Sequence, residues 1–183
     1  MKEKKIGPLV LSMAFPMMLS MAFSSLYNIV DSYFVAKLSE DAMTALSLVY
    51  PAQNLLTAIA VGFGVGINAL IAFYLGAGDQ KRADKTATQG MVLGTLHGLV
   101  LMAVFLLGMS RFLGLFTESR QVLTLGCQYS KVVFLFSVVV TAGITLEKIF
   151  QAVGQMRATM ISMIAGFVTN ILLDPLLIFG IGP

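Results

Sequence analysis

Residues Met43–Leu75 decide the fold of this chain, and they read MTALSLVYPAQNLLTAIAVGFGVGINALIAFYL without a single Asp, Glu, Lys or Arg. A helix needs about 20 consecutive, mostly apolar residues to cross a bilayer. The stretch therefore predicts a membrane-spanning helix. Because it is longer than a bilayer requires, we expect it to tilt or to extend into the water on either side.

Further apolar runs lie on both sides of this stretch, separated by short charged loops. Of all residues in the chain, 57% are apolar and only 11% are charged, whereas a soluble domain carries about 25% charged residues. We therefore predict an all-α fold, a polytopic membrane helix bundle of about five transmembrane helices. The other four spans are expected at Leu9–Val35, Ala87–Leu107, Val122–Phe150 and Thr159–Phe179.

Composition also excludes several classes of protein. The net charge of +3 comes from short loops rather than from a basic face, so no nucleic-acid partner is predicted. Cys127 is the single cysteine, which excludes an intramolecular disulfide. The apolar run from Ile6 to Ile29 is too long for the apolar core of a signal peptide, so it is interpreted as an uncleaved first helix.

The basic residues predict the orientation. Cytoplasmic loops of membrane proteins carry an excess of Lys and Arg. With alternating spans, most basic residues share a side with the N-terminus, while the acids of the first external loop fall opposite. We therefore expect a multi-pass protein of the cytoplasmic membrane with a cytoplasmic N-terminus. The residues on that side are Lys2, Lys4, Lys5, Lys81, Arg82, Lys85, Lys148 and Arg157.

Two aspartates, Asp31 and Asp174, each lie near the end of a long apolar stretch that holds no other acid. A carboxylate at bilayer depth costs roughly 2.5–3.5 kcal/mol on insertion scales, so it marks either a function or a polar partner. At a rise of about 1.5 Å per residue, both aspartates and Tyr129 fall in the outer half of the membrane. Depth agreement permits a shared site but does not require one.

The neighbours of these aspartates favour a cation site. Asn170 and Asp174 are spaced i, i+4 and share one helix face, and Asn28 precedes Asp31 by three residues. Pro175 cannot donate to the carbonyl of residue 171, so a helix kink is predicted there. A freed carbonyl beside a carboxylate and a carboxamide suits H⁺ or Na⁺. The alternative is that each aspartate is a hydrogen bonder in helix packing.

Other polar residues carry weaker predictions. Gln53 and Asn54 are expected either to line a cavity or to bond between helices. Glu147 and the adjacent Lys148 are interpreted as an ion pair at the membrane interface. His97 is assigned a packing role.

The glycines predict close helix packing. Gly90, Gly94 and Gly98 form a GxxxGxxxG face, whose spacing lets helix backbones approach closely. The run from Gly62 to Gly66 lacks the preceding strand of a nucleotide-binding loop, so it is assigned to helix packing as well.

Four segments resemble the multidrug and toxic compound extrusion (MATE) family. The segment 75–83, LGAGDQKRA, is similar to a cytoplasmic turn of that family. Residues 116–118, FTE, with 146–154, LEKIFQAVG, and 170–180, NILLDPLLIFG, are similar to its fourth and fifth helices. Their order and spacing extend the resemblance over nearly the whole chain.

The resemblance implies both architecture and activity. Family members have twelve helices in two six-helix lobes, and they export cationic amphipathic compounds in exchange for H⁺ or Na⁺. In members with an acidic first helix, the cation site corresponds to Asp31, Asn170 and Asp174, with Tyr129 joining its network. No cofactor is implied beyond the coupling ion, and no metal other than Na⁺ at these residues. Glu147 and Gln151 differ from the residues of many members, so no role is transferred to them.

The resemblance also implies that residues 1–183 correspond to the N-terminal lobe, helices 1–5. The sixth helix and the C-terminal lobe would then be absent from this chain, and the missing lobe would be its partner, together with the lipid bilayer and the small cationic substrates. Alone, the chain is not expected to transport, because alternating access needs two lobes.

Three alternatives remain open from the sequence. A lipid-linked oligosaccharide flippase of the same superfamily would line its cavity with many basic residues, and few occur in these spans. An intramembrane aspartyl protease would use two carboxylates that share a proton, but Asp174 follows Ile-Leu-Leu rather than the GxG of such enzymes. A non-transporting scaffold would tolerate loss of both aspartates.

Overall fold

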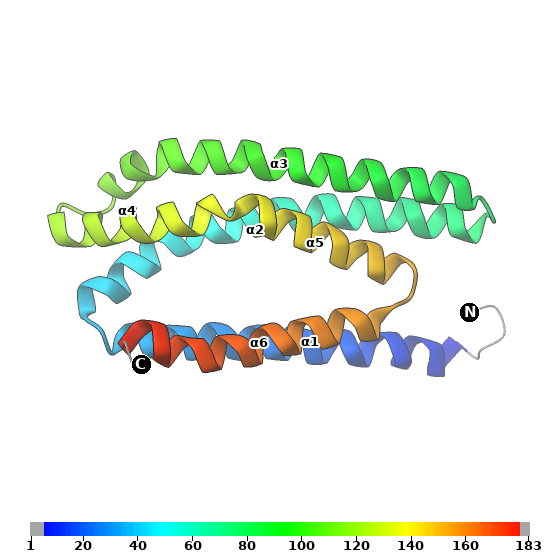
Figure 1. Ribbon diagram of the computed structural model, residues 1–183, viewed down its shortest axis with the longest axis horizontal. Helices are drawn as coiled ribbons and strands as arrows, with labels where there is room; N and C mark the ends of the chain where they lie inside the picture. Colours follow the sequence, from blue (N-terminus) through cyan, green and yellow to red (C-terminus); the bar gives the residue numbers. More distant parts are fainter. Residues whose placement is uncertain (1–5, 180–183) are drawn as a thin grey trace. The chain divides into compact units, whose positions relative to one another are not determined.

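The computed structural model describes residues 6–179, which form six helices and no strand (Figure 1). This confirms the predicted all-α fold. The helices are joined by short connections, and they are α1 (Ile6–Ala36), α2 (Glu40–Gly76), α3 (Gln80–Gly114), α4 (Arg120–Leu135), α5 (Ser137–Ala152) and α6 (Met156–Phe179).

Four of the described helices, α1, α2, α3 and α6, are long and apolar enough to cross a membrane, and α4 with α5 forms a fifth candidate span that is bent by 47°. The predicted spans are therefore all represented. The predicted fourth span, Val122–Phe150, differs in being broken at Phe136. Ser137 is fully buried at the break, and its hydroxyl donates to the carbonyl of Phe134 at 2.7 Å. A serine whose hydroxyl bonds back to a carbonyl of the preceding turn favours such a bend.

Polar residues at the loops begin the helices. Ser39 Oγ accepts from the backbone N–H of Ala42 before α2, and Asp79 Oδ1 accepts from that of Arg82 before α3. Such N-caps satisfy backbone donors that the first turn of a helix leaves without a partner. Gly78 lies between α2 and α3 with a φ of 78°, a conformation that glycine adopts without strain.

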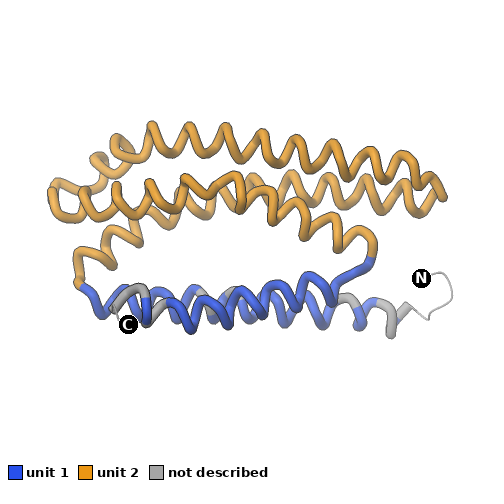
Figure 2. Tube along the Cα trace, viewed as in Figure 1, with its two compact units in different colours: residues 1–38, 154–183 blue, residues 39–153 orange. Residues whose placement is uncertain are grey.

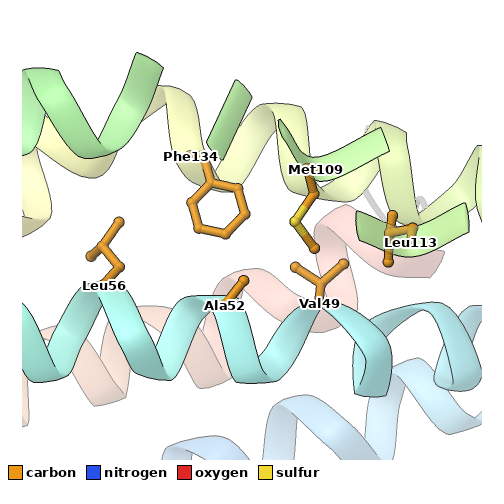
Figure 3. Close-up of a cluster of buried hydrophobic side chains, with 6 residues drawn as sticks. All are labelled: Val49, Ala52, Leu56, Met109, Leu113 and Phe134. Carbon is orange, nitrogen blue, oxygen red and sulfur yellow. The ribbon is translucent and has the colours of Figure 1, made fainter. Parts of the chain in front are cut away.

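The chain divides into two compact units (Figure 2). The larger unit, residues 39–153, contains α2 to α5. Its apolar core is built by one face of each of three helices, as Figure 3 shows. The six buried side chains are Val49, Ala52 and Leu56 of α2, Met109 and Leu113 of α3, and Phe134 of α4. Phe134 also stacks on Phe105, with ring centroids 4.4 Å apart.

The predicted glycine face brings α3 close to its neighbours in this unit. A Cβ atom at Gly90 would lie 2.8 Å from Ile67 Cγ2 of α2, and one at Gly98 would lie 2.8 Å from Val138 Cα of α5. A Cβ atom at Gly94 would overlap Thr145 Oγ1. The predicted close packing is therefore confirmed, and the face is shared between α2 and α5.

The smaller unit consists of the described parts of residues 1–38 and 154–183. Its helices α1 and α6 pack side by side and run in the same direction (Figure 1). Phe23 of α1 contacts Phe167 of α6, with ring centroids 5.4 Å apart. This pair sets the register between the two helices.

Candidate cation site and polar clusters

The contact face of α6 carries the predicted cation-site positions. Phe167 contacts α1, and Asn170 and position 174 follow it at i+3 and i+7, which places all three on one side of the helix. Because the chain is helical through this segment, the spacing predicted from the sequence is preserved. Asn170 thus lies on the side of α6 that faces α1.

Asp31 lies at nearly the same level. Since Phe23 is beside Phe167 and the helices are parallel, Asp31, eight residues after Phe23, is offset from position 174, seven residues after Phe167, by about 1.5 Å along the axis. The backbone level of Asn170 is about 7.5 Å from that of Asp31 on the same basis. The side chains of Asp31 and Asn170 are half-buried. These levels agree with the predicted site.

The side chains of Asp174 and Pro175 lie outside the described residues. The helix continues from Met156 to Phe179 and so does not end at Pro175. A bend there, and a contact between the two aspartate side chains, stay predictions.

Tyr129 and Gln53 are brought together in the larger unit. Gln53 Nε2 of α2 donates to the hydroxyl of Tyr129 of α4 at 3.2 Å. Of the two roles considered for Gln53, the structure shows the bond between helices. The predicted link from Tyr129 to Asp31 joins two different units and stays a prediction. The other predicted cavity residues, Asn28 and Asn54, are exposed.

A second polar cluster lies where α5 meets α2. Lys148 Nζ is 3.2 Å from Glu147 Oε1 and 3.2 Å from Gln151 Oε1, and Gln151 Nε2 donates to Glu147 Oε1 at 2.6 Å. The lysine side chain is only 15% exposed, and Gln151 is buried. The ion pair predicted from the sequence is therefore present, but it is largely enclosed by protein.

Two residues of α2 hold this cluster in place. Asn68 Nδ2 donates to the carbonyl of Lys148 at 2.8 Å, and a Cβ atom at Gly64 would lie 2.7 Å from Lys148 Cγ. Gly64 and Asn68 are spaced i, i+4 and share a face. Sequence reasoning missed their role because no pattern within α2 indicates which helix that face meets.

His97 contacts α2 as well. Its ring lies 4.1 Å from that of Phe63, centroid to centroid, and its Nδ1 donates to the carbonyl of Leu93 at 2.8 Å. These contacts agree with the predicted packing role.

Helices of spanning length that pack through a glycine face define a multi-pass membrane helix bundle. Residues 16–176 match the model of the MatE family. The chain therefore belongs to the MatE family, as the sequence motifs predicted. This is a family of transporters rather than of enzymes, as the sequence motifs implied, and the match does not favour the aspartyl protease alternative.

Known relatives match over most of this chain. The multidrug export protein MepA of Staphylococcus aureus is 32% identical over 166 residues, covering 90% of this chain and 37% of MepA. MepA of Staphylococcus haemolyticus is 29% identical over 181 residues, covering 98% of this chain and 40% of that protein. The chain thus spans about two fifths of the length of these relatives.

Solved structures show the same arrangement of helices. A MATE transporter in complex with MaD3S has a TM-score of 0.91 and 26% identity, covering 95% of this chain and 39% of that chain. A MOP-superfamily transporter from Pyrococcus furiosus, described as having a binding pocket of reversed polarity, has a TM-score of 0.90 and 26% identity, covering 95% of this chain and 38% of that one. The match to part of a larger helical transporter agrees with the predicted architecture.

Proposed function

We propose that this chain supplies the coupling lobe of an ion-driven antiporter, which exports cationic amphipathic drugs and other xenobiotics across the cytoplasmic membrane in exchange for H⁺ or Na⁺. Membership of the MatE family and the similarity to MepA support a role in multidrug export. The coupling site is assigned to Asp31, Asn170 and Asp174.

The observation that carries this proposal is the register between α1 and α6. The Phe23–Phe167 contact brings Asp31 and position 174 to within about one residue's rise of each other along parallel helices. An acidic residue in a spanning helix is costly unless it has a function or a polar partner, and two acids at one level are costlier still.

The chemistry of these residues suits a small cation. Two neighbouring carboxylates in a poorly solvated site share one proton, because both cannot ionise together without strong repulsion. Carboxylate and carboxamide oxygens are also hard ligands of the kind that alkali and alkaline-earth cations prefer. One site therefore serves either coupling ion, with Asn170 as the neutral ligand.

The coupling site acts by exchanging its cation when access to water changes. A bound proton or Na⁺ offsets one of the two negative charges, and its release leaves both carboxylates charged at the α1–α6 seam. The cation-bound and cation-free states therefore favour different arrangements of α1 and α6. The free-energy difference between these arrangements is what couples the ion to transport. A bend at Pro175 would let α6 respond.

The test replaces each acid by its neutral isostere in the complete two-lobe transporter. Asp31→Asn and Asp174→Asn keep the shape of the side chain and remove the charge, so each is expected to abolish ion-driven transport of ethidium into inverted vesicles while membrane insertion is unchanged. Asp84→Asn, at an exposed acid near the start of α3, is the matched control and should export normally.

Efflux at the wild-type rate in both variants would show that the aspartates are structural. The flippase alternative would be favoured by a different result. Both variants would insert normally and keep ethidium transport, but they would lose ion-dependent movement of a lipid-linked sugar.

A further inference from the structure

Helices α2 and α3 enclose a groove that the proposed function does not use. Its volume is about 530 Å³. Glycines make it hollow, because a Cβ atom at Gly62 or Gly66 would meet no neighbouring atom within 4 Å. The lining residues come from one face of each helix, and they are Gly62, Phe63, Gly66, Ile67, Leu70 and Tyr74 of α2, with Thr86, Gln89, Gly90 and Leu93 of α3.

The groove has the length and polarity of an amphiphile in one leaflet. From Tyr74 to Phe63 it extends about 16 Å along α2, close to half of the roughly 30 Å hydrocarbon thickness of a bilayer. Tyr74, Thr86 and Gln89 lie toward the α2–α3 turn, and the other end is lined by Phe63 and Leu93. One end is thus polar and the other apolar.

A positively charged side chain, that of Arg82, lies at the polar end of the groove. Arg82 precedes Thr86 and Gln89 by four and seven residues and so lies on the same face of α3. Its guanidinium carbon is 5.9 Å from the centroid of the Tyr74 ring, and its side chain is 69% exposed. Arg82 Nε is 3.2 Å from Asp79 Oδ2. A guanidinium has five N–H donors, so the contact with Asp79 leaves donors that can bind a phosphate.

The charge at this end favours an anion. Residues 79–85 carry three cations, Lys81, Arg82 and Lys85, against the two carboxylates of Asp79 and Asp84, a net charge of +1. A cationic amphiphile would be repelled here, and a neutral one would gain nothing from Arg82. A phosphate gains charge-assisted hydrogen bonds from arginine.

We propose that this groove binds an anionic phospholipid from the leaflet that meets the α2–α3 turn. One acyl chain lies along Gly66 and Gly62, and the phosphate lies against Arg82, with Lys85 adding charge. The ester region meets Thr86 and Gln89. The site is built from α2 and α3 alone and does not depend on the coupling ion.

The chain has no tryptophan, which permits a direct test. Leu70→Trp places a single fluorophore, the groove probe, among the lining residues. Phe73→Trp places another, the control probe, at nearly the same depth on an exposed residue that does not line the groove. Each variant of the full chain is reconstituted in vesicles of equal phosphatidylglycerol and phosphatidylcholine, with one or the other lipid brominated to quench the fluorescence.

The two probes should report different lipids. The preference for phosphatidylglycerol over phosphatidylcholine, measured by quenching, should be about fivefold greater at the groove probe than at the control probe. This is the effect expected from one additional cation near an anionic lipid.

Two further changes, each made in the Leu70→Trp chain, separate the headgroup from the acyl chain. Arg82→Gln with Lys85→Gln should reduce the lipid preference at the groove probe to the level at the control probe, while Arg111→Gln at the other end of α3 should not. Gly66→Leu fills the groove without a clash and should weaken quenching of the groove probe by both lipids, whereas Gly143→Leu, also in open space, should not. Circular dichroism checks that each variant is folded.

Three results would overturn the proposal. Equal lipid preference at the two probes would show only general attraction to a basic loop. A preference that survives loss of both cations would exclude Arg82 as the phosphate ligand. A groove probe that neither brominated lipid quenches would show that protein, rather than lipid, covers the groove.

Discussion

At the scale of single residues, a close contact between helices lies where Gly94 of α3 faces Thr145 of α5. Thr145 is buried, and its hydroxyl donates to the carbonyl of Thr141 at 2.8 Å, so it has little freedom to move away. Any side chain at position 94 therefore displaces a helix rather than a flexible group. The identity of residue 94 is set by the neighbouring helix.

Gly94→Leu is accordingly expected to reduce folded yield severalfold, because overpacking a close helix contact costs about 1–3 kcal/mol. Gly143→Leu adds the same side chain in open space on α5 and should leave the yield near that of the unmodified chain. Leu99→Ala, which removes an exposed apolar side chain, should also cost less than Gly94→Leu. Monodisperse protein recovered by size-exclusion chromatography measures all three.

A double substitution tests the proposed cause. Gly94→Ala should destabilise the chain, and adding Thr145→Ala should restore part of the loss, because the second change removes the hydroxyl that the new methyl group meets. Purely additive effects on the thermal midpoint would show that Thr145 is not the obstacle.

At the scale of elements, α5 is attached to α2 through Lys148. The lysine stem crosses Gly64, its carbonyl accepts from Asn68, and its ammonium is balanced by Glu147. An apolar helix contact alone would allow sliding in a bilayer, where lipid competes equally well for apolar surface. The polar contacts specify the register.

Lys148→Met is expected to destabilise the chain by about 1–3 kcal/mol, because it removes a cation that hydrogen-bonds Glu147 in an enclosed site. The double variant Lys148→Met, Glu147→Gln removes the remaining charge and should recover much of this loss. Unfolding of both variants by a denaturing detergent, with Lys131→Met as a control at an exposed lysine of α4, provides the comparison. If the double variant is no more stable than Lys148→Met alone, the charge of Lys148 does not balance that of Glu147.

At the scale of the whole molecule, the distribution of basic residues should determine how the spans are oriented. Tags at the N-terminus and in the segment 78–84, which includes the α2–α3 turn and the start of α3, are expected to be cytoplasmic, and a tag near Glu40 is expected to be external, following the excess of Lys and Arg. Labelling of introduced cysteines with a membrane-impermeant maleimide in intact cells, using a Cys127→Ser background, measures this. Labelling of the segment 78–84 from outside would reverse the orientation.

The division into two units bears on the coupling proposal at this scale. Asp31, Asn170 and Asp174 belong to the smaller unit, whereas Tyr129 and Gln53 belong to the larger one. The helices that carry the three predicted ligands, α1 and α6, are far apart in the chain and pack on each other. The similar levels of Asp31 and position 174 could be anticipated from helix rise, because depth in a bilayer follows from residue count alone.

The sequence by itself determined the spans, their approximate number and the glycine face. The physical reason is that these properties are local: a bilayer selects helices by apolar length, and small residues four apart remain on one face whatever they meet. The family motifs and the spacing of Asn170 and Asp174 were equally visible.

Only the tertiary structure decided which partner each face meets. It places Thr145 and Ile67 against the glycines, Tyr129 against Gln53, and Asn68 against the end of α5. It also breaks the fourth span at Phe136, next to the place where Phe134 is buried against Phe105 of α3. These outcomes depend on contacts between residues that are distant in sequence, and the periodicity of one helix carries no information about the face of another.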